Sequence, residues 1–160
     1  MTFKTADLCD DFTSIVQMAA PIFRDFGGNK TFGGPIATVK VFEDNVLVRR
    51  TLETAGQGRV LVVDGGGSTR CALLGDRLAG LAHDNGWAGV VIYGCLRDSV
   101  DVGQIAVGVK ALAAVPKRSN KKGEGESDIP VRFADVTFTP GHYLYADEDG
   151  ILVAPKELRF

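Results

Sequence analysis

The chain has 160 residues, of which 45% are hydrophobic and 24% charged, and its formal net charge is −2 at pH 7. This composition is that of an ordinary globular protein, and the length favours a single domain over residues 1–160. The lack of a basic surplus argues against nucleic acid as a ligand, because phosphates are bound by excess Lys and Arg. No apolar run in the sequence approaches the roughly 20 residues of a membrane-spanning helix, so no membrane partner is expected.

The three cysteines, Cys9, Cys71 and Cys95, are widely separated along the chain. Their spacing gives no C-x-x-C motif and no Cys/His cluster, so it supports neither a disulfide framework nor a zinc site. Reduced thiols, together with an N-terminus that lacks the apolar segment of a signal peptide, lead us to expect a cytoplasmic protein.

The first third of the chain predicts a helix, a loop, a strand and a second helix. Thr5 is expected to cap the first helix. Glycines at 27–28 and 33–34 mark the loop, after which residues 36–42 alternate branched and smaller side chains as a strand does. Helical spacing of apolar residues predicts the second helix over 45–53.

The centre of the chain begins with a continuous apolar run over 59–63, which is typical of a strand buried on both faces. The sequence Asp64-Gly65-Gly66-Gly67 that follows invites a nucleotide-binding interpretation. It lacks the third glycine of G-x-G-x-x-G, the Gly-Lys-Ser/Thr of a P-loop and the alternating glycines of a methyltransferase loop. A tight turn is therefore favoured, after which residues 68–74 are expected to form a short helix capped by Ser68.

A strand–helix–strand unit follows from the next segment. Gly75 breaks the short helix, Asp76 is expected to cap a longer one, and Gly86 ends it. The apolar residues 89–93 form the next strand, and a right-handed parallel crossover is expected between the two central strands. Residues 107–115 give a further strand candidate.

The C-terminal third is more strand-rich. Its basic residues at 117–122 are followed directly by acidic ones, which favours a solvated loop over an RNA-binding patch. Asp149-Gly150 is a turn dipeptide that joins two apolar segments in a hairpin. We therefore expect an α/β fold with parallel central strands and an antiparallel C-terminal part.

The densest group of charged side chains directly follows the strand 89–93. Arg97 can fork onto an anion such as a carboxylate. If a helix begins at Asp98, then Asp98 and Asp101 lie one turn apart on one face, where they could hold a metal ion. These residues alone leave an alternative open, in which Asp98 only caps the helix and Asp101 lies near its positive end.

A second candidate site is the loop Gly75-Asp76-Arg77-Leu78. The backbone amides of Asp76, Arg77 and Leu78 would be unpaired donors at a helix start and would suit an anion. This loop and Arg97 leave the carboxyl sides of neighbouring strands, where open α/β sheets form their binding crevices. The alternative is an ordinary helix start.

Several segments taken together make the sequence similar to the RraA-like family. They are residues 5–10, 32–35, 39–45, 58–68, 86–89, 97–98 and 145–151, and they span nearly the whole chain. The resemblance implies a single-domain α/β/β swivelling-type fold that assembles as a homotrimer.

The resemblance also implies one of two functions. One group of the family consists of non-catalytic regulators that bind and inhibit ribonuclease E. The other consists of divalent-metal-dependent (class II) aldolases that cleave 4-hydroxy-4-methyl-2-oxoglutarate to release pyruvate, with oxaloacetate decarboxylase activity. The aldolases carry an Arg-Asp pair after a glycine-bearing loop and an acidic residue three positions later. Retention of Asp98 beside Arg97 points to the aldolase.

By this resemblance, Asp98 would hold Mg²⁺ or Mn²⁺ and Asp101 would reach the ion through water. Arg97 and the loop Gly75, Asp76, Arg77 and Leu78 would bind the pyruvyl part of a small 2-oxo acid. Asp76 could orient a water that acts as the base, with Arg97 as the second catalytic residue. Longer family aldolases carry extra C-terminal sequence with a further acidic residue, for which no equivalent is identified before Phe160.

Overall fold

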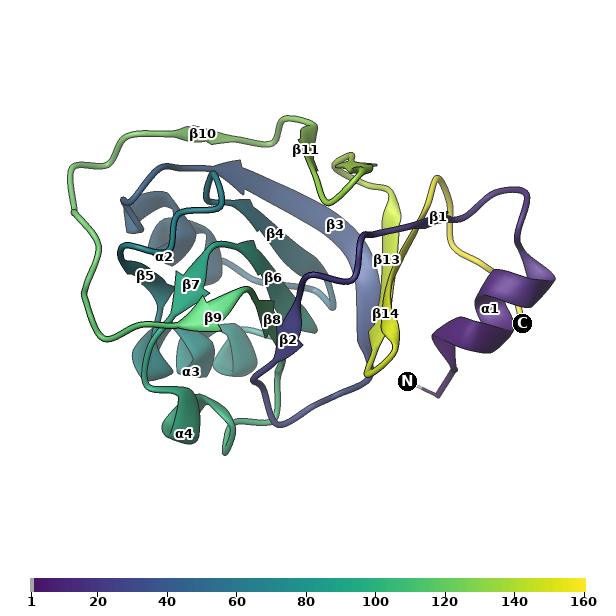
Figure 1. Ribbon diagram of the computed structural model, residues 1–160, viewed down its shortest axis with the longest axis horizontal. Coiled ribbons are helices and arrows are strands. Elements are labelled where there is room, and N and C mark those ends of the chain that lie inside the picture. The colour runs from purple at the N-terminus through teal and green to yellow at the C-terminus, as the bar shows by residue number, and fades with distance from the viewer. Residues whose placement is uncertain (1) are drawn as a thin grey trace.

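One large mixed sheet organises the molecule (Figure 1). In the computed structural model, which describes residues 2–160, the sheet has nine strands in the order β1-β14-β13-β3-β4-β6-β8-β2, with β10 paired to β3. The strands are β1 (Gln17–Met18), β2 (Arg24–Asp25), β3 (Phe32–Lys40), β4 (Val60–Asp64), β6 (Gly89–Tyr93), β8 (Gly108–Ala111), β10 (Glu126–Ser127), β13 (Tyr143–Asp147) and β14 (Gly150–Ala154).

The centre of this sheet is parallel and its flanks are antiparallel. Strands β3, β4, β6 and β8 pair in parallel. Beyond them, β13, β14 and β1 continue antiparallel on one side, and β2 pairs antiparallel with β8 on the other. The predicted parallel centre, antiparallel C-terminal part and hairpin at Asp149-Gly150 are therefore confirmed.

Both faces of the central strands are buried, as the continuous apolar runs predicted. Alternate side chains of a strand point to opposite faces. Leu61 and Val63 accordingly belong to one core cluster, and Val60 and Val62 belong to another. The first cluster is covered by the helices α2 (Val46–Leu52), α3 (Asp76–Asp84) and α4 (Ser99–Val102), and the second by the hairpin β11 (Val131–Phe133) and β12 (Val136–Phe138).

A second, smaller sheet positions the candidate site. It consists of three short parallel strands in the order β5-β7-β9, with bounds β5 (Ala72–Leu74), β7 (Cys95–Leu96) and β9 (Ala113–Ala114). Each of them follows one strand of the large sheet, and single residues, Gly94 and Leu112, separate β6 from β7 and β8 from β9. The chain thus changes sheet without forming a long loop.

The helix predicted over 68–74 is wrong, because its last three residues form strand β5. Parallel pairing with β7 and the burial of all three β5 side chains outweigh the capping potential of Ser68. The glycine turn before it is confirmed: the amides of Gly65 and Gly67 donate to the carbonyl oxygen of Tyr93 over 3.0 and 3.1 Å.

The helix α1 (Thr5–Asp11) lies beside the C-terminal end of the chain (Figure 1). Lys4, and not Thr5, occupies its capping position. Thr5 instead donates to Asp147, from its hydroxyl over 2.6 Å and from its amide over 2.7 Å. Burial raises the pKa of Asp147, but these donors outweigh it and hold the pKa below its ordinary value. In the described part of the chain, no helix has the length and apolar character needed to cross a membrane.

Candidate functional site

The carboxyl ends of the small sheet's strands surround a cavity of about 440 Å³. Leu74 and Gly75 reach it from the end of β5, Arg97 and Asp98 from the end of β7, and Arg118 from the segment after β9. This is the edge of a parallel sheet at which α/β proteins place their binding crevices.

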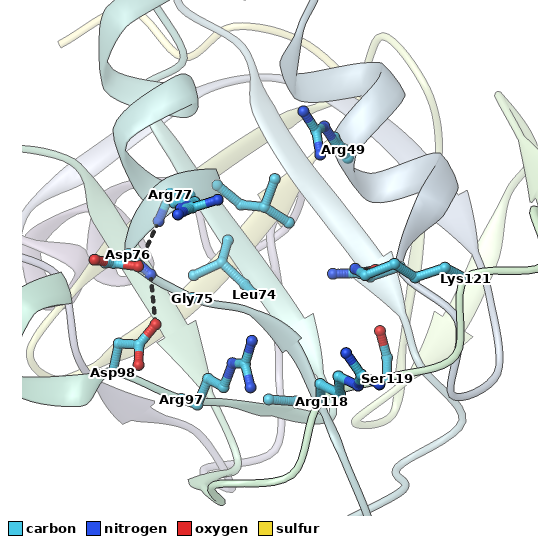
Figure 2. Close-up of a pocket in the computed structure, with 13 residues that line it drawn as sticks. Arg49, Leu74, Gly75, Asp76, Arg77, Arg97, Asp98, Arg118, Ser119 and Lys121 are labelled. Atoms are coloured by element: carbon cyan, nitrogen blue, oxygen red, sulfur yellow. Dashed lines mark hydrogen bonds between the residues drawn. The ribbon is translucent and has the colours of Figure 1, made fainter.

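Arg97 is fixed at this edge by the backbone. Its amide donates to the carbonyl oxygen of Leu74 over 2.9 Å, which extends the pairing of β5 with β7 by one residue. The Arg97 side chain then extends beside the cavity between Asp98 and Arg118 (Figure 2). Its guanidinium makes no ion pair with another described residue, so its donors are available to an anion.

Asp98 occupies the N-cap position of α4, as one of the two sequence interpretations predicted, but without a side-chain capping bond, and its role as a metal ligand stays a prediction. Its backbone is left-handed, with φ 57° and ψ 40°, and α4 begins one residue later at Ser99. The Asp98 side chain makes no capping bond to α4; its Oδ2 accepts the amide of Asp76 over 3.2 Å, at the start of α3. Asp98 therefore holds the positive end of a neighbouring helix while it lines the cavity.

The close approach of the two loops requires a glycine. A Cβ placed on Gly75 would lie 2.6 Å from Oδ2 of Asp98, well inside van der Waals contact. Gly75, which was predicted only to bind substrate, thus fixes the position of the Asp98 carboxylate.

The backbone amides at the start of α3 are less free than predicted. The Asp76 amide is bonded to Asp98, and the Arg77 amide donates to Oδ1 of Asp76 over 2.8 Å. Two of the three amides expected to bind an anion are thus already paired with the protein's own carboxylates. Leu78 is buried and lines the cavity, and the side chains of Arg77 and Arg97 supply the positive charge beside it.

Asp101 does not lie with the other predicted site residues. It is exposed on α4 and is not among the residues that line the cavity. The difference follows from Asp98, whose left-handed backbone removes it from the helix that would have set the two carboxylates one turn apart.

The carboxylates of Asp98 and Asp76 both line the cavity and are of the ligand type that Mg²⁺ prefers. Within residues 2–160, no group of three His, Cys, Asp or Glu side chains is arranged to enclose a metal. Mg²⁺ is bound in many enzymes by one or two carboxylates, with water and substrate oxygens completing the shell. The donor set therefore suits an open site of this kind and does not suit a closed structural one.

Positive side chains dominate the rest of the cavity. Arg49, Arg77, Arg97, Arg118 and Lys121 line it, against the carboxylates of Asp76 and Asp98. Figure 2 shows the two aspartates on one side and Arg118, Ser119 and Lys121 on the other. The chain as a whole has a net charge of −2, but the residues that line this cavity carry more positive than negative charges, which favours anionic ligands.

Residues 116–124, which we call the strap, also contribute to the cavity. Arg118 and Lys121 are exposed, in agreement with the predicted solvated loop, but together with the buried Ser119 they line the cavity, which was not predicted from the sequence. The strap follows β9 and pairs with β5 through a bridge between Arg118 and Ala72. The signal was present in the parallel order of the strands, because the segment after 107–115 must emerge at the same edge as Arg97.

Asp44 anchors the strap. Its buried carboxylate accepts the amides of Lys122, Gly123 and Glu124 over 2.8, 2.9 and 3.3 Å, and the amide of Val46 over 3.1 Å. Burial raises the pKa of Asp44, but the four backbone donors outweigh it and hold the pKa below its ordinary value. The ionised form thus keeps the strap over the cavity.

The fold is that of the aldolase/RraA class of α/β proteins. The chain belongs to the RraA-like family, whose model, described as Aldolase/RraA, matches residues 5–153. A relative from Alkalilimnicola ehrlichii is 59% identical over 158 residues, covering 99% of this chain and 98% of its own length. A relative from Aromatoleum aromaticum is 58% identical and covers 99% of each chain. Both are named, provisionally, as 4-hydroxy-4-methyl-2-oxoglutarate aldolases.

Two solved structures superimpose closely on this chain and carry different names. One, from Geobacillus kaustophilus, is described as an S-adenosylmethionine:2-dimethylmenaquinone methyltransferase; its TM-score is 0.96 at 54% identity, covering 98% of this chain and 97% of that one. The other is described as the RNA-processing inhibitor RraA from Thermus thermophilis; its TM-score is 0.95 at 46% identity, covering 99% and 96%. The shared backbone confirms the fold, while the chemistry must be argued from the site.

Proposed function

We propose that the chain is a divalent-metal-dependent aldolase that cleaves 4-hydroxy-4-methyl-2-oxoglutarate to pyruvate and also decarboxylates oxaloacetate. The observation that carries the proposal is the pairing of Arg97 and Asp98 in one cavity, with Gly75 packed against the Asp98 carboxylate. The provisional names of the relatives support the same activity. We further propose that the protein is cytoplasmic and assembles as a homotrimer.

Asp98 would hold Mg²⁺ or Mn²⁺, with Asp76 beside it; Asp101 would take part only through water. The ion, when bound, supplies a Lewis acid that draws electrons toward the 2-keto oxygen of the substrate. Arg97 would bind the adjacent carboxylate through two parallel N–H donors, and Arg77, which also lines the cavity, adds positive charge. This arrangement fixes the plane of the pyruvyl group, which is the orientation that cleavage requires.

The cleavage itself breaks the bond between C3 and C4 of the substrate. The C4 hydroxyl loses its proton as its oxygen forms a carbonyl, and the bonding electron pair passes to C3 of the pyruvyl part. C3 then takes up a proton, which gives two molecules of pyruvate. We assign Asp76 to orient the water that accepts the hydroxyl proton, since its carboxylate is held in place by the Arg77 amide.

The proposal is tested by pyruvate release from oxaloacetate and from 4-hydroxy-4-methyl-2-oxoglutarate in the presence of Mg²⁺. Asp98→Asn keeps a residue that tolerates the left-handed backbone and removes the charge, so we expect a loss on the order of 10²–10³-fold in kcat/KM. Arg97→Met is expected to cost about 2–4 kcal/mol of transition-state binding. Arg50→Met, an exposed change on α2 outside the cavity, is the control. Activity that survives EDTA or Asp98→Asn would exclude the proposal.

A second candidate function, a non-catalytic regulator that binds ribonuclease E, is favoured by the likeness to the RNA-processing inhibitor structure. Stoichiometric capture of ribonuclease E by the chain, equal for wild type and Asp98→Asn, would support it. A methyltransferase role is not proposed, because the amides of Gly65 and Gly67 already donate to the carbonyl oxygen of Tyr93 and are not available to bind a nucleotide.

A further inference from the structure

The strap carries a group of side chains that the proposed chemistry does not use. Arg118, Ser119 and Lys121 line the cavity opposite Asp76 and Asp98 (Figure 2). Neither Arg118 nor Lys121 forms an ion pair with a described residue. Their charges are therefore uncompensated beside the cavity, at the end away from the residues that would bind the ion.

Ser119 gives a second and independent indication of a ligand. It is only 6% exposed, and its Oγ has no hydrogen-bond partner within residues 2–160. A buried hydroxyl without a partner costs free energy, and native structures pair such groups with protein, water or a ligand. Ser119 lines the cavity and stands between Arg118 and Lys121 in the sequence, and a serine hydroxyl without a partner can donate to an anion that reaches it.

The strap is also held in place before any ligand binds. Asp44 accepts three of its amides, and Lys121 donates from Nζ to Oδ1 of Asn45 over 3.0 Å. Asn45 in turn donates to the carbonyl oxygen of Leu73 over 3.3 Å, which connects the strap to β5. Groups fixed in this way lose little conformational entropy on binding.

We propose that Arg118, Ser119 and Lys121 form a subsite for a second carboxylate, so that the cavity selects 2-oxo acids with two carboxylates over those with one. The inference rests on the proposed function, because it takes Arg97 as the site of the first carboxylate. In 4-hydroxy-4-methyl-2-oxoglutarate the second carboxylate is bonded to C4, on the far side of the bond that breaks. The strap would therefore hold the leaving half of the substrate while Arg97 holds the other.

Binding measurements test the subsite without turnover. We would titrate the wild type with 2-oxoglutarate and with pyruvate by calorimetry in the presence of Mg²⁺, since both have the same 2-oxo carboxylate and only the first has a second one. We expect 2-oxoglutarate to bind about tenfold more tightly, as a charge-assisted contact implies. Arg118→Met and Ser119→Ala should each bring the ratio of the two dissociation constants toward one.

Lys122→Met is the matched control, because it removes an exposed positive charge from the same strap at a residue that does not line the cavity. It should leave the ratio as in the wild type. A wild type that binds both acids equally would overturn the subsite, as would a ratio that Arg118→Met does not change or that Lys122→Met changes as much.

The activity assay distinguishes this failure from that of the proposed function. Selective binding of the diacid by a wild type that cleaves nothing would exclude the aldolase and retain the subsite. If cleavage occurs, Arg118→Met should raise the KM for 4-hydroxy-4-methyl-2-oxoglutarate more than it lowers kcat, because this contact exists before and during the reaction. If Arg118→Met instead disturbed the structure of the site, it would lower both the kcat for this substrate and the rate at which pyruvate exchanges its C3 protons.

Discussion

The parallel strands at the centre of the large sheet and the parallel strands of the small sheet differ in where they place their polar residues. Strands β4, β6 and β8 of the large sheet bury nearly all their side chains, with Val62 and Val91 fully enclosed. Strands β5, β7 and β9 of the small sheet have only two or three residues each, and the chain leaves each of them for exposed, charged residues at the cavity. The long strands thus supply the core, and the ends of the short strands supply the site.

The largest expected effect is a loss of stability without a loss of activity, in the hairpin β11-β12 that packs on the large sheet. Phe138 is fully buried in the cluster opposite the helices and stacks on Phe133 at a ring-centroid distance of 4.5 Å. Phe138→Ala should lower the free energy of unfolding by about 3–5 kcal/mol, measured by urea titration. Pyruvate release per folded molecule should not change. A loss of activity at a constant folded fraction would show that the core cluster beneath this hairpin is coupled to the cavity.

A smaller effect is expected where the small sheet ends. In Gly75→Ala the new Cβ would displace the Asp98 carboxylate, and a misplacement of this size costs about 10- to 100-fold in kcat/KM. The assay is pyruvate release with Mg²⁺ at saturating and limiting substrate. Gly80→Ala is the control on the same helix, because nothing lies within 4 Å of its Cβ position. It should keep activity and raise the free energy of unfolding by about 0.5–1 kcal/mol. Equal kinetics for the two variants would contradict the role given to Gly75.

The smallest effect concerns the strap and depends on pH. The folded pKa of Asp44 is below its unfolded value, so its ionised form stabilises the fold above the unfolded pKa. This stabilisation is lost as the pH falls through the folded pKa. Asp44→Asn should therefore cost about 1–2 kcal/mol of unfolding free energy at pH 7 and progressively less in acid. Urea titrations of both proteins at several pH values test this, and a difference that stays constant with pH would refute the account.

Much of the large sheet could be predicted from the sequence, because its signal is local. The apolar runs at 59–63 and 89–93 and the helical spacing at 45–53 each correspond to an observed element. The small sheet could not be predicted in this way. Strand β5 was expected to be helical, and β7 and β9 are two-residue strands whose pairing depends on contacts between segments far apart in the chain.

The same limit applies to the site. Arg97, Asp98 and the loop from Gly75 to Leu78 were identified because they directly follow apolar segments, and the structure brings them to one cavity. The engagement of the Asp76 amide by Asp98 depends on the left-handed backbone of Asp98, which no local pattern indicates. Arg118, Ser119 and Lys121 were missed because a basic segment beside an acidic one is usually solvated, and it is brought to the cavity by long-range contacts such as the bridge to Ala72 and the bonds to Asp44.

The left-handed conformation of Asp98 has a consequence for how proteins of this fold can diverge. Glycine, asparagine and aspartate are the residues that adopt this conformation most readily. Exchange of the aspartate for either of the other two would remove the negative charge from the cavity without strain on the backbone. A single substitution could thus remove the proposed chemistry and leave the fold unchanged. Chains with nearly identical backbones can for this reason differ in what they do.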